Sequence, residues 1–77
     1  MTEEQAIARL HAHFKTAKDY IRLDMEYLAG IYAGFIIQEG VGIGADELKN
    51  DMLDQLHALR NEMAQARKEI AAARGAA

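Results

Sequence analysis

Residues 27–37, with the sequence YLAGIYAGFII, contain no charged side chain. On a helix that turns about 100° per residue, Leu28, Ile31 and Phe35 cover one side, and the residues between them cover the other sides. A helix that is apolar all round has to be buried on every side. Because a chain of 77 residues has little material to bury it with, the stretch predicts that a second copy or a partner covers it.

The composition bounds the fold class. The chain is 51% apolar and 6% aromatic and contains no proline, which is the profile of a helical protein. It has no cysteine, so neither a disulfide framework nor a thiolate metal site is available to stabilise a small core. The net charge of −3 argues against general binding of polyanions. We therefore expect one all-α domain over residues 1–77, stabilised by oligomerisation.

The beginning of the chain and the length of the apolar stretch bear on localisation. Met1 is followed by Thr2, Glu3 and Glu4, whereas a secretory signal begins with basic residues and an apolar run. The uncharged stretch over 27–37 is shorter than the about 20 residues that span a bilayer. We therefore expect a cytoplasmic protein without a membrane partner.

A long first helix is predicted from its start signal and its apolar period. Thr2 stands three residues before Gln5, a spacing that forms a capping box at a helix start. Asp24 is the one residue that interrupts the apolar stripe. The stripe consists of Ile7, Leu10, Phe14, Ala17, Ile21, Leu28, Ile31 and Phe35. Its alternating steps of three and four predict one helix over about 3–39.

The segment GVGIG, which contains Gly40, Gly42 and Gly44, predicts the one turn in the chain. A second helix over about 45–74 follows. Its stripe consists of Leu48, Met52, Leu56, Leu59, Met63, Ala66, Ile70 and Ala73. Because the link is short, the two helices should lie antiparallel. We expect a two-helix hairpin that pairs with a second copy into a dimeric four-helix bundle.

The predicted self-association surface lies in the uncharged stretch. Gly30 and Gly34 each cost about 1 kcal/mol of helix propensity. Small residues four apart let another helix backbone come close, which offsets that cost, although they also suit a local kink. The predicted interface residues are Tyr27, Leu28, Gly30, Ile31, Gly34, Phe35 and Ile37.

An ion pair between Asp24 and Arg60 is predicted from the hairpin geometry. Folding the chain about residue 42 places these two residues opposite one another. A carboxylate on an apolar stripe is costly unless it is paired. The pair would set the register of the two helices more than it would stabilise them.

A stripe of basic residues suggests a nucleic-acid contact. His11, Lys15, Lys18 and Arg22 follow one another at steps of four, three and four, so they share a helix face that could contact phosphates. The alternative is a solvated face whose aliphatic stems cover apolar surface. At the other end, residues 24–56 carry seven acidic side chains and one basic one. That end could dock on a basic groove, although solubility explains most of its charge.

The sequence contains no arrangement of residues that predicts catalysis. No Ser/His/Asp set or acid pair can be identified, so we expect no enzyme and no catalytic residue. Asp54 and His57 have the spacing of bundle metal ligands, but this pair occurs once and is expected to be surface. GVGIG lacks the lysine and hydroxyl of a phosphate-binding loop. We expect neither a metal nor a cofactor.

These observations favour a non-enzymatic, homo-oligomeric helical protein that acts through protein–protein interaction. It would serve as a small inhibitor, adaptor or regulator, of the kind found among phage or plasmid accessory proteins. The alternative is a nucleic-acid-binding helical bundle that uses the basic stripe. A third reading makes the apolar stretch the docking site of an unrelated subunit, so that the lone chain is only partly folded.

Overall fold

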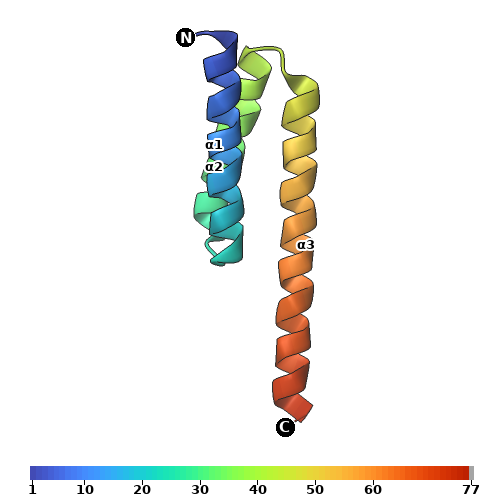
Figure 1. The fold of residues 1–77 in the computed structure, drawn as a ribbon. Coiled ribbons are helices and arrows are strands. Elements are labelled where there is room, and N and C mark those ends of the chain that lie inside the picture. The colour runs from blue at the N-terminus through green and yellow to red at the C-terminus, as the bar shows by residue number, and fades with distance from the viewer. Residues whose placement is uncertain (77) are drawn as a thin grey trace.

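The computed structural model describes residues 1–76, and these residues form helices and short turns without any strand. The helices are α1 (Glu3–Arg22), α2 (Glu26–Gly42) and α3 (Asp46–Ala76), as Figure 1 shows. The predicted all-α class is confirmed. The predicted hairpin of two helices is wrong for the single chain, because the first predicted helix is divided in two.

The first helix begins where the capping box predicts. The Thr2 hydroxyl accepts a hydrogen bond from the Gln5 amide at 3.1 Å. In return, the Thr2 amide donates to the Gln5 side-chain oxygen at 2.9 Å. These reciprocal bonds satisfy amides that have no partner inside the helix.

The chain reverses at residues 23–25, where a continuous helix over about 3–39 was expected. Asp24 has a left-handed backbone, with φ of 59°. The Met25 amide donates to the carbonyl oxygen of Tyr20 at 2.9 Å, and the Asp24 amide donates to that of Ile21 at 3.1 Å. This pair of bonds is the Schellman motif, which ends helices and usually has glycine at the left-handed position. Because aspartate stands there instead, the apolar pattern continues without a visible stop signal.

The second turn, over residues 43–45, has the same hydrogen bonds with glycine in place. Gly44 has φ of 69°, and its amide donates to the carbonyl oxygen of Val41 at 3.1 Å. The Ala45 amide donates to that of Gly40 at 2.9 Å. Gly40 and Gly42 therefore lie inside α2, and only the last glycine of GVGIG forms the turn.

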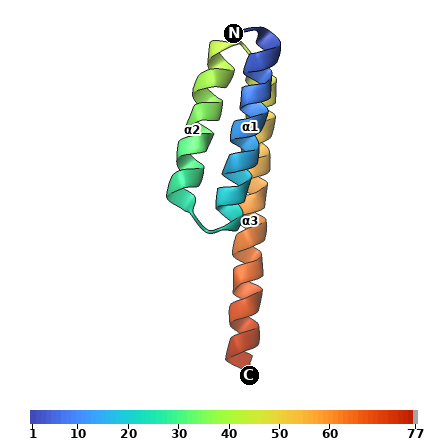
Figure 2. The ribbon, with the colours of Figure 1, turned by 60° about the vertical axis from the view of Figure 1, so that its left-hand side comes forward.

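The three helices pack side by side, with α1 antiparallel to α2 and α2 antiparallel to α3 (Figures 1 and 2). α3 has 31 residues, against 20 in α1 and 17 in α2. Its C-terminal part therefore extends alone beyond the turn at 23–25, as both views show. The molecule is a rod of 55 × 19 × 16 Å.

The core lies between the three helices. Its buried members are Leu10, Phe14, Ala17, Ile21, Ala29, Ile36, Met52 and Leu56. The apolar stripe of α1 is buried from Leu10 to Ile21 as its period predicts, and Ile7 is half-buried. Because the chain reverses at Asp24, α2 does not continue that stripe, and Ile31 and Phe35 are exposed where Ala29 and Ile36 are buried.

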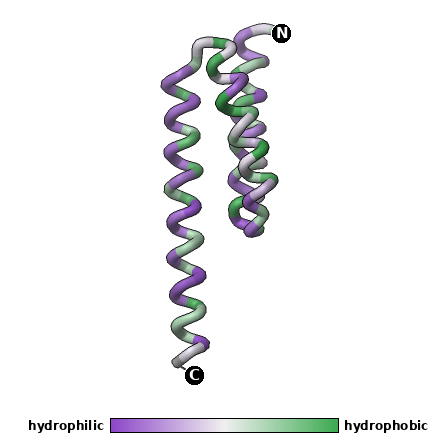
Figure 3. Tube along the Cα trace, turned by 180° about the vertical axis from the view of Figure 1, so that it is seen from behind, coloured by the Kyte–Doolittle hydropathy of each residue, from purple (hydrophilic) through white to green (hydrophobic). Residues whose placement is uncertain are grey.

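α3 follows its predicted stripe only over its first part. Met52 and Leu56 are buried, and Leu59 and Met63 are partly buried against the core. From residue 67 to residue 75 every side chain is exposed. In Figure 3 most of α3 is coloured hydrophilic, with hydrophobic residues recurring at intervals down its length. We call residues 67–75 the overhang of α3.

Candidate functional site

α2 carries apolar residues on its outward side as well as on the side that faces the core. Ala29 and Gly40 are buried, together with Ile36. A surface helix normally carries charged residues on its outward side, but the outward side of α2 has none over residues 27–38. We call this side the outer face of α2. It consists of Tyr27, Gly30, Ile31, Gly34, Phe35, Ile37, Gln38 and Val41.

Large apolar side chains of the outer face are well exposed. Tyr27 is 82% exposed, Val41 56% and Ile37 46%. Ile31 and Phe35 are each exposed by more than a third. Single exposed apolar residues are normal on a protein surface, whereas these five share one helix face.

The two glycines of the outer face have no role in packing within the chain. A Cβ atom added at Gly30 or at Gly34 would meet no atom within 4 Å. At Gly40, by contrast, an added Cβ would lie 2.9 Å from Cβ of Lys49, so that glycine lets α3 approach α2. Gly30 and Gly34 lower the helix propensity of α2, and no close packing within the chain offsets this cost.

The predicted interface residues lie on this outer face, with Leu28 as the exception. Leu28 is half-buried at its edge. Val41 belongs to the face and was missed by sequence reasoning, because residues from Gly40 onward were interpreted as turn. Its position seven residues after Gly34 was the signal that could have found it.

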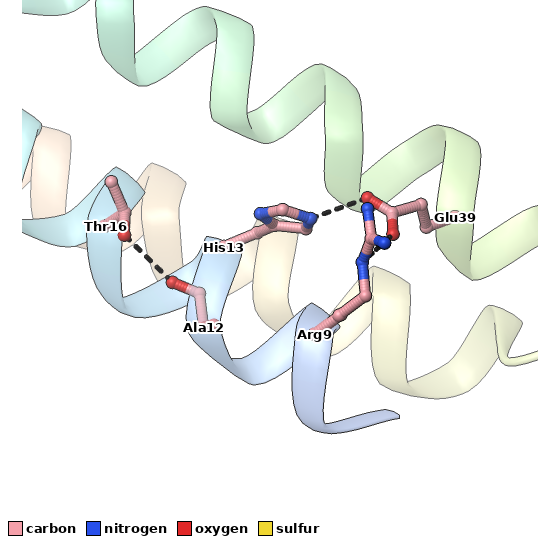
Figure 4. A network of polar contacts seen from close by, with 5 residues as sticks. All are labelled: Arg9, Ala12, His13, Thr16 and Glu39. Atoms are coloured by element: carbon pink, nitrogen blue, oxygen red, sulfur yellow. Dashed lines mark hydrogen bonds and ion pairs between the residues drawn. The ribbon is translucent and has the colours of Figure 1, made fainter. Parts of the chain in front are cut away.

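A polar contact joins α1 to the edge of the outer face (Figure 4). The Glu39 carboxylate pairs with Arg9 Nε at 2.9 Å through Oε1 and contacts His13 Nε2 at 2.6 Å through Oε2. His13 Nε2 is buried and forms no hydrogen bond, so the carboxylate is its close neighbour without being a hydrogen-bond partner. Nearby, the Thr16 hydroxyl donates to the carbonyl oxygen of Ala12 at 3.0 Å.

Aromatic rings continue from His13 onto α2. The His13 ring lies 5.3 Å from the Phe35 ring and 5.9 Å from the Tyr32 ring, measured between centroids. Tyr32 and Phe35 meet edge to face at 5.3 Å, and Tyr20 lies 5.6 Å from Tyr32. These distances are those of favourable aromatic pairs. The cluster therefore holds one side of the outer face against α1.

The predicted ion pair between Asp24 and Arg60 does not form, and each residue has another partner. Arg60 Nε lies 2.7 Å from Glu26 Oε1, and Asp24 Oδ1 lies 3.2 Å from Arg67 Nη2. The reversal at residues 23–25 changes the register that the hairpin implied. Asp24 and Glu26 are both largely exposed, so neither pair compensates a buried charge.

The basic stripe lies on α1, and most of its members have neighbours within the chain. Asp19 lies 3.9 Å from Lys15 Nζ and 3.6 Å from Arg22 Nη1. The Lys18 ammonium lies over the Phe14 ring, 4.3 Å from its centre, so its stem covers apolar surface. His11 is exposed. Asp19 therefore dilutes the positive charge of the stripe.

Metal sites, pockets and membrane spans are absent from residues 1–76. No three His, Asp or Glu side chains in this part of the chain are placed to hold a metal ion, and its surface has no pocket. Asp54 and His57 are both exposed. None of the described helices has a stretch long and apolar enough to cross a membrane. Comparison with protein-family models, curated proteins and solved structures finds no match to this chain.

Proposed function

We propose that this chain is a non-enzymatic, homo-oligomeric interaction protein that acts through the outer face of α2. The observation that carries the proposal is the uncharged and exposed character of that face, on a helix whose opposite side already fills the core. Leaving such a face in water forgoes about 25 cal/mol per Å² of apolar surface, which association recovers. A small inhibitor, adaptor or regulator is the class of protein that fits.

The glycines of the outer face support self-association in particular. Gly30 and Gly34 have no side chains, and they lie four residues apart beside Tyr27 and Ile31. We call the low strip of surface over these two glycines the glycine track. A second α2 can lay its own glycine track there, and the two backbones then approach closely. Each copy offers the same surface, as a two-fold interface requires. The cost in helix propensity is thereby offset between chains.

The proposal predicts that substitutions on the outer face change association and leave the fold intact. Tyr27→Asp places a charge where a partner would cover it, and Gly34→Leu fills the track. Because neither position contacts the core, both variants should keep their helix content while the dimer dissociation constant rises at least tenfold, about 1.4 kcal/mol. Gly34→Leu should in addition make the monomer more stable, because leucine is a better helix former than glycine.

Sedimentation equilibrium and circular dichroism make this measurement. Ala58→Leu on the exposed side of α3 is the matched control for adding a large apolar side chain, and it should leave the dissociation constant unchanged. A wild-type chain that stays monomeric at all concentrations would contradict self-association. A partner protein captured by the wild type but not by Tyr27→Asp would still support docking by this face. Phe35 is a poorer probe, because it packs on His13.

Nucleic-acid binding by the basic stripe is the second candidate. It is favoured by the exposure of Lys15, whose side chain is 80% accessible. We rank it lower because Asp19 lies beside Lys15 and Arg22, and because the net charge of the chain is −3. A phosphate contact by Lys18 would require its ammonium to leave the Phe14 ring.

A further inference from the structure

The two turns of the chain are built alike but differ in their left-handed residue. Each has the pair of hydrogen bonds of a Schellman motif. Gly44 takes the left-handed backbone at the second turn, whereas Asp24 takes it at the first. A residue with a Cβ atom is disfavoured in this conformation, although aspartate tolerates it better than most. The turn between α1 and α2 is therefore the less stable of the two.

The residues around the first turn suit a continuous helix better than a turn. Leu23 is 66% exposed and Met25 43% exposed, which is unusual for two apolar residues flanking a turn. The stripe that ends at Ile21 in α1 resumes in α2 with Leu28, Ile31 and Phe35 at the same helical spacing. Straightening residues 23–25 would make one helix from residue 3 to residue 42, about 60 Å long at 1.5 Å per residue.

Apart from the ion pair between Arg67 and Asp24, the overhang of α3 is exposed along its length in the folded single chain. Ile70 is 52% exposed and continues the stripe that Met63 and Ala66 begin, followed by Ala73. α1 and α2 do not reach this part of α3 (Figures 1 and 2). If the first turn straightened, α1 would leave the core and run beyond α2, alongside the overhang.

We propose that two copies of this chain exchange α1 by straightening the turn at residues 23–25. The α1 of each copy then occupies the place between α2 and α3 of the other copy. A two-fold axis near the turns, perpendicular to the helices, relates the copies. Every core contact of Leu10, Phe14 and Ile21 is kept, now between chains, while the two overhangs lie beside exchanged helices. The exchange does not depend on the outer face of α2.

Exchange of a terminal helix is favourable for simple physical reasons. The closed and exchanged forms have the same α1 contacts, so the difference between them lies in the turn, the overhang and the entropy of association. Straightening removes the left-handed Asp24 and covers Leu23, Met25 and Ile70. The Asp24 to Arg67 ion pair is lost, but exposed pairs of this kind contribute little.

Two substitutions at Asp24 test the proposal in opposite directions. Asp24→Ala favours the straight helix, and Asp24→Gly favours the closed turn, while both remove the ion pair to Arg67. The equilibrium constant for straightening one turn should be about tenfold larger for Asp24→Ala than for Asp24→Gly. Because a dimer has two turns, their dimer dissociation constants should differ by about a hundredfold.

Crosslinking identifies which chains are joined. The protein has no cysteine, so Arg9→Cys with Glu39→Cys places one thiol on α1 and one on α2 at a contact between them. A short bismaleimide should link these thiols within one chain in the closed form and between two chains in the exchanged dimer. Dimers of the Asp24→Ala chain, isolated by gel filtration, should give covalent dimers on a denaturing gel, and Asp24→Gly should give monomers.

Two results would overturn the exchange. One is an Asp24→Ala chain that remains monomeric at its highest soluble concentration. The other is a dimer whose crosslinks all stay within single chains, which would leave association through the outer face of α2 standing. Loss of that face by Tyr27→Asp, in turn, should not alter the crosslinks between chains. The two proposals therefore fail separately.

Discussion

Single glycines in α2 have opposite environments although they look alike in the sequence. Gly40 is buried, and an added Cβ would crowd Cβ of Lys49, which cannot move without moving the backbone of α3. Gly34 faces open space. The difference depends on which side of α2 packs against α3, and no local pattern reports it. The fold therefore requires glycine at residue 40, whereas Gly34 is available for an interface with another chain.

This difference predicts opposite stability changes for one substitution. Gly34→Ala should raise the free energy of unfolding of the monomer by about 1 kcal/mol, because alanine is the better helix former and meets no neighbour. Gly40→Ala should lower it by about 1 kcal/mol, because overpacking against Lys49 exceeds the gain in propensity. Urea denaturation of both variants makes the comparison, and shifts of equal sign would contradict it.

Pairs of helices are joined by ion pairs whose environments differ. Glu39 on α2 contacts Arg9 and His13 of α1, and its side chain is 28% exposed. Glu26 contacts Arg60 of α3, and its side chain is 63% exposed. Charge-assisted contacts are stronger where water is partly excluded, while exposed pairs contribute little. The α1–α2 pair should therefore depend more on its carboxylate than the α2–α3 pair does.

Replacement of each carboxylate by alanine tests that expectation. Glu39→Ala should lower the free energy of unfolding by about 1–2 kcal/mol, because it removes the ion pair to Arg9 and the polar group beside the buried His13 Nε2. Glu26→Ala should change it by less than about 1 kcal/mol. Thermal melts followed by circular dichroism at a concentration that keeps the chain monomeric measure both. If Glu26→Ala lowered the free energy of unfolding more than Glu39→Ala does, the exposure of the carboxylate would not determine how much each ion pair stabilises the fold.

At the scale of helices, the predictions succeeded where the signal was local. The capping box at Thr2, the α1 stripe to Ile21 and the α3 stripe to Met63 all have their expected positions. The reversal at Asp24 was missed because aspartate is a weak signal for a left-handed turn. The side of α2 that faces the core was missed with it, since Ile31 and Phe35 follow the α1 period but do not share its direction.

The whole molecule is a three-helix body from which α3 extends as an overhang. Ile70 lies on that overhang and contributes nothing to the core. Ile70→Gln should therefore leave the stability of the monomer within about 0.5 kcal/mol of wild type. In the exchanged dimer the same position is covered, so the substitution should weaken the dimer of the Asp24→Ala chain. Analytical ultracentrifugation of that double variant measures the effect, and an unchanged dimer would place Ile70 outside the interface.

The sequence by itself determined the helical class, the start of α1, the apolar stripes of α1 and α3 and the uncharged stretch at residues 27–37, because each depends on local spacing. Only the tertiary structure decided that the chain reverses at Asp24. This reversal divides the first predicted helix into α1 and α2, and it leaves Ile31 and Phe35 exposed. The physical reason is one of magnitude. A left-handed aspartate costs at most about 1–2 kcal/mol, whereas burying Leu10, Phe14 and Ile21 within the same chain contributes about 1.5–3 kcal/mol for each side chain.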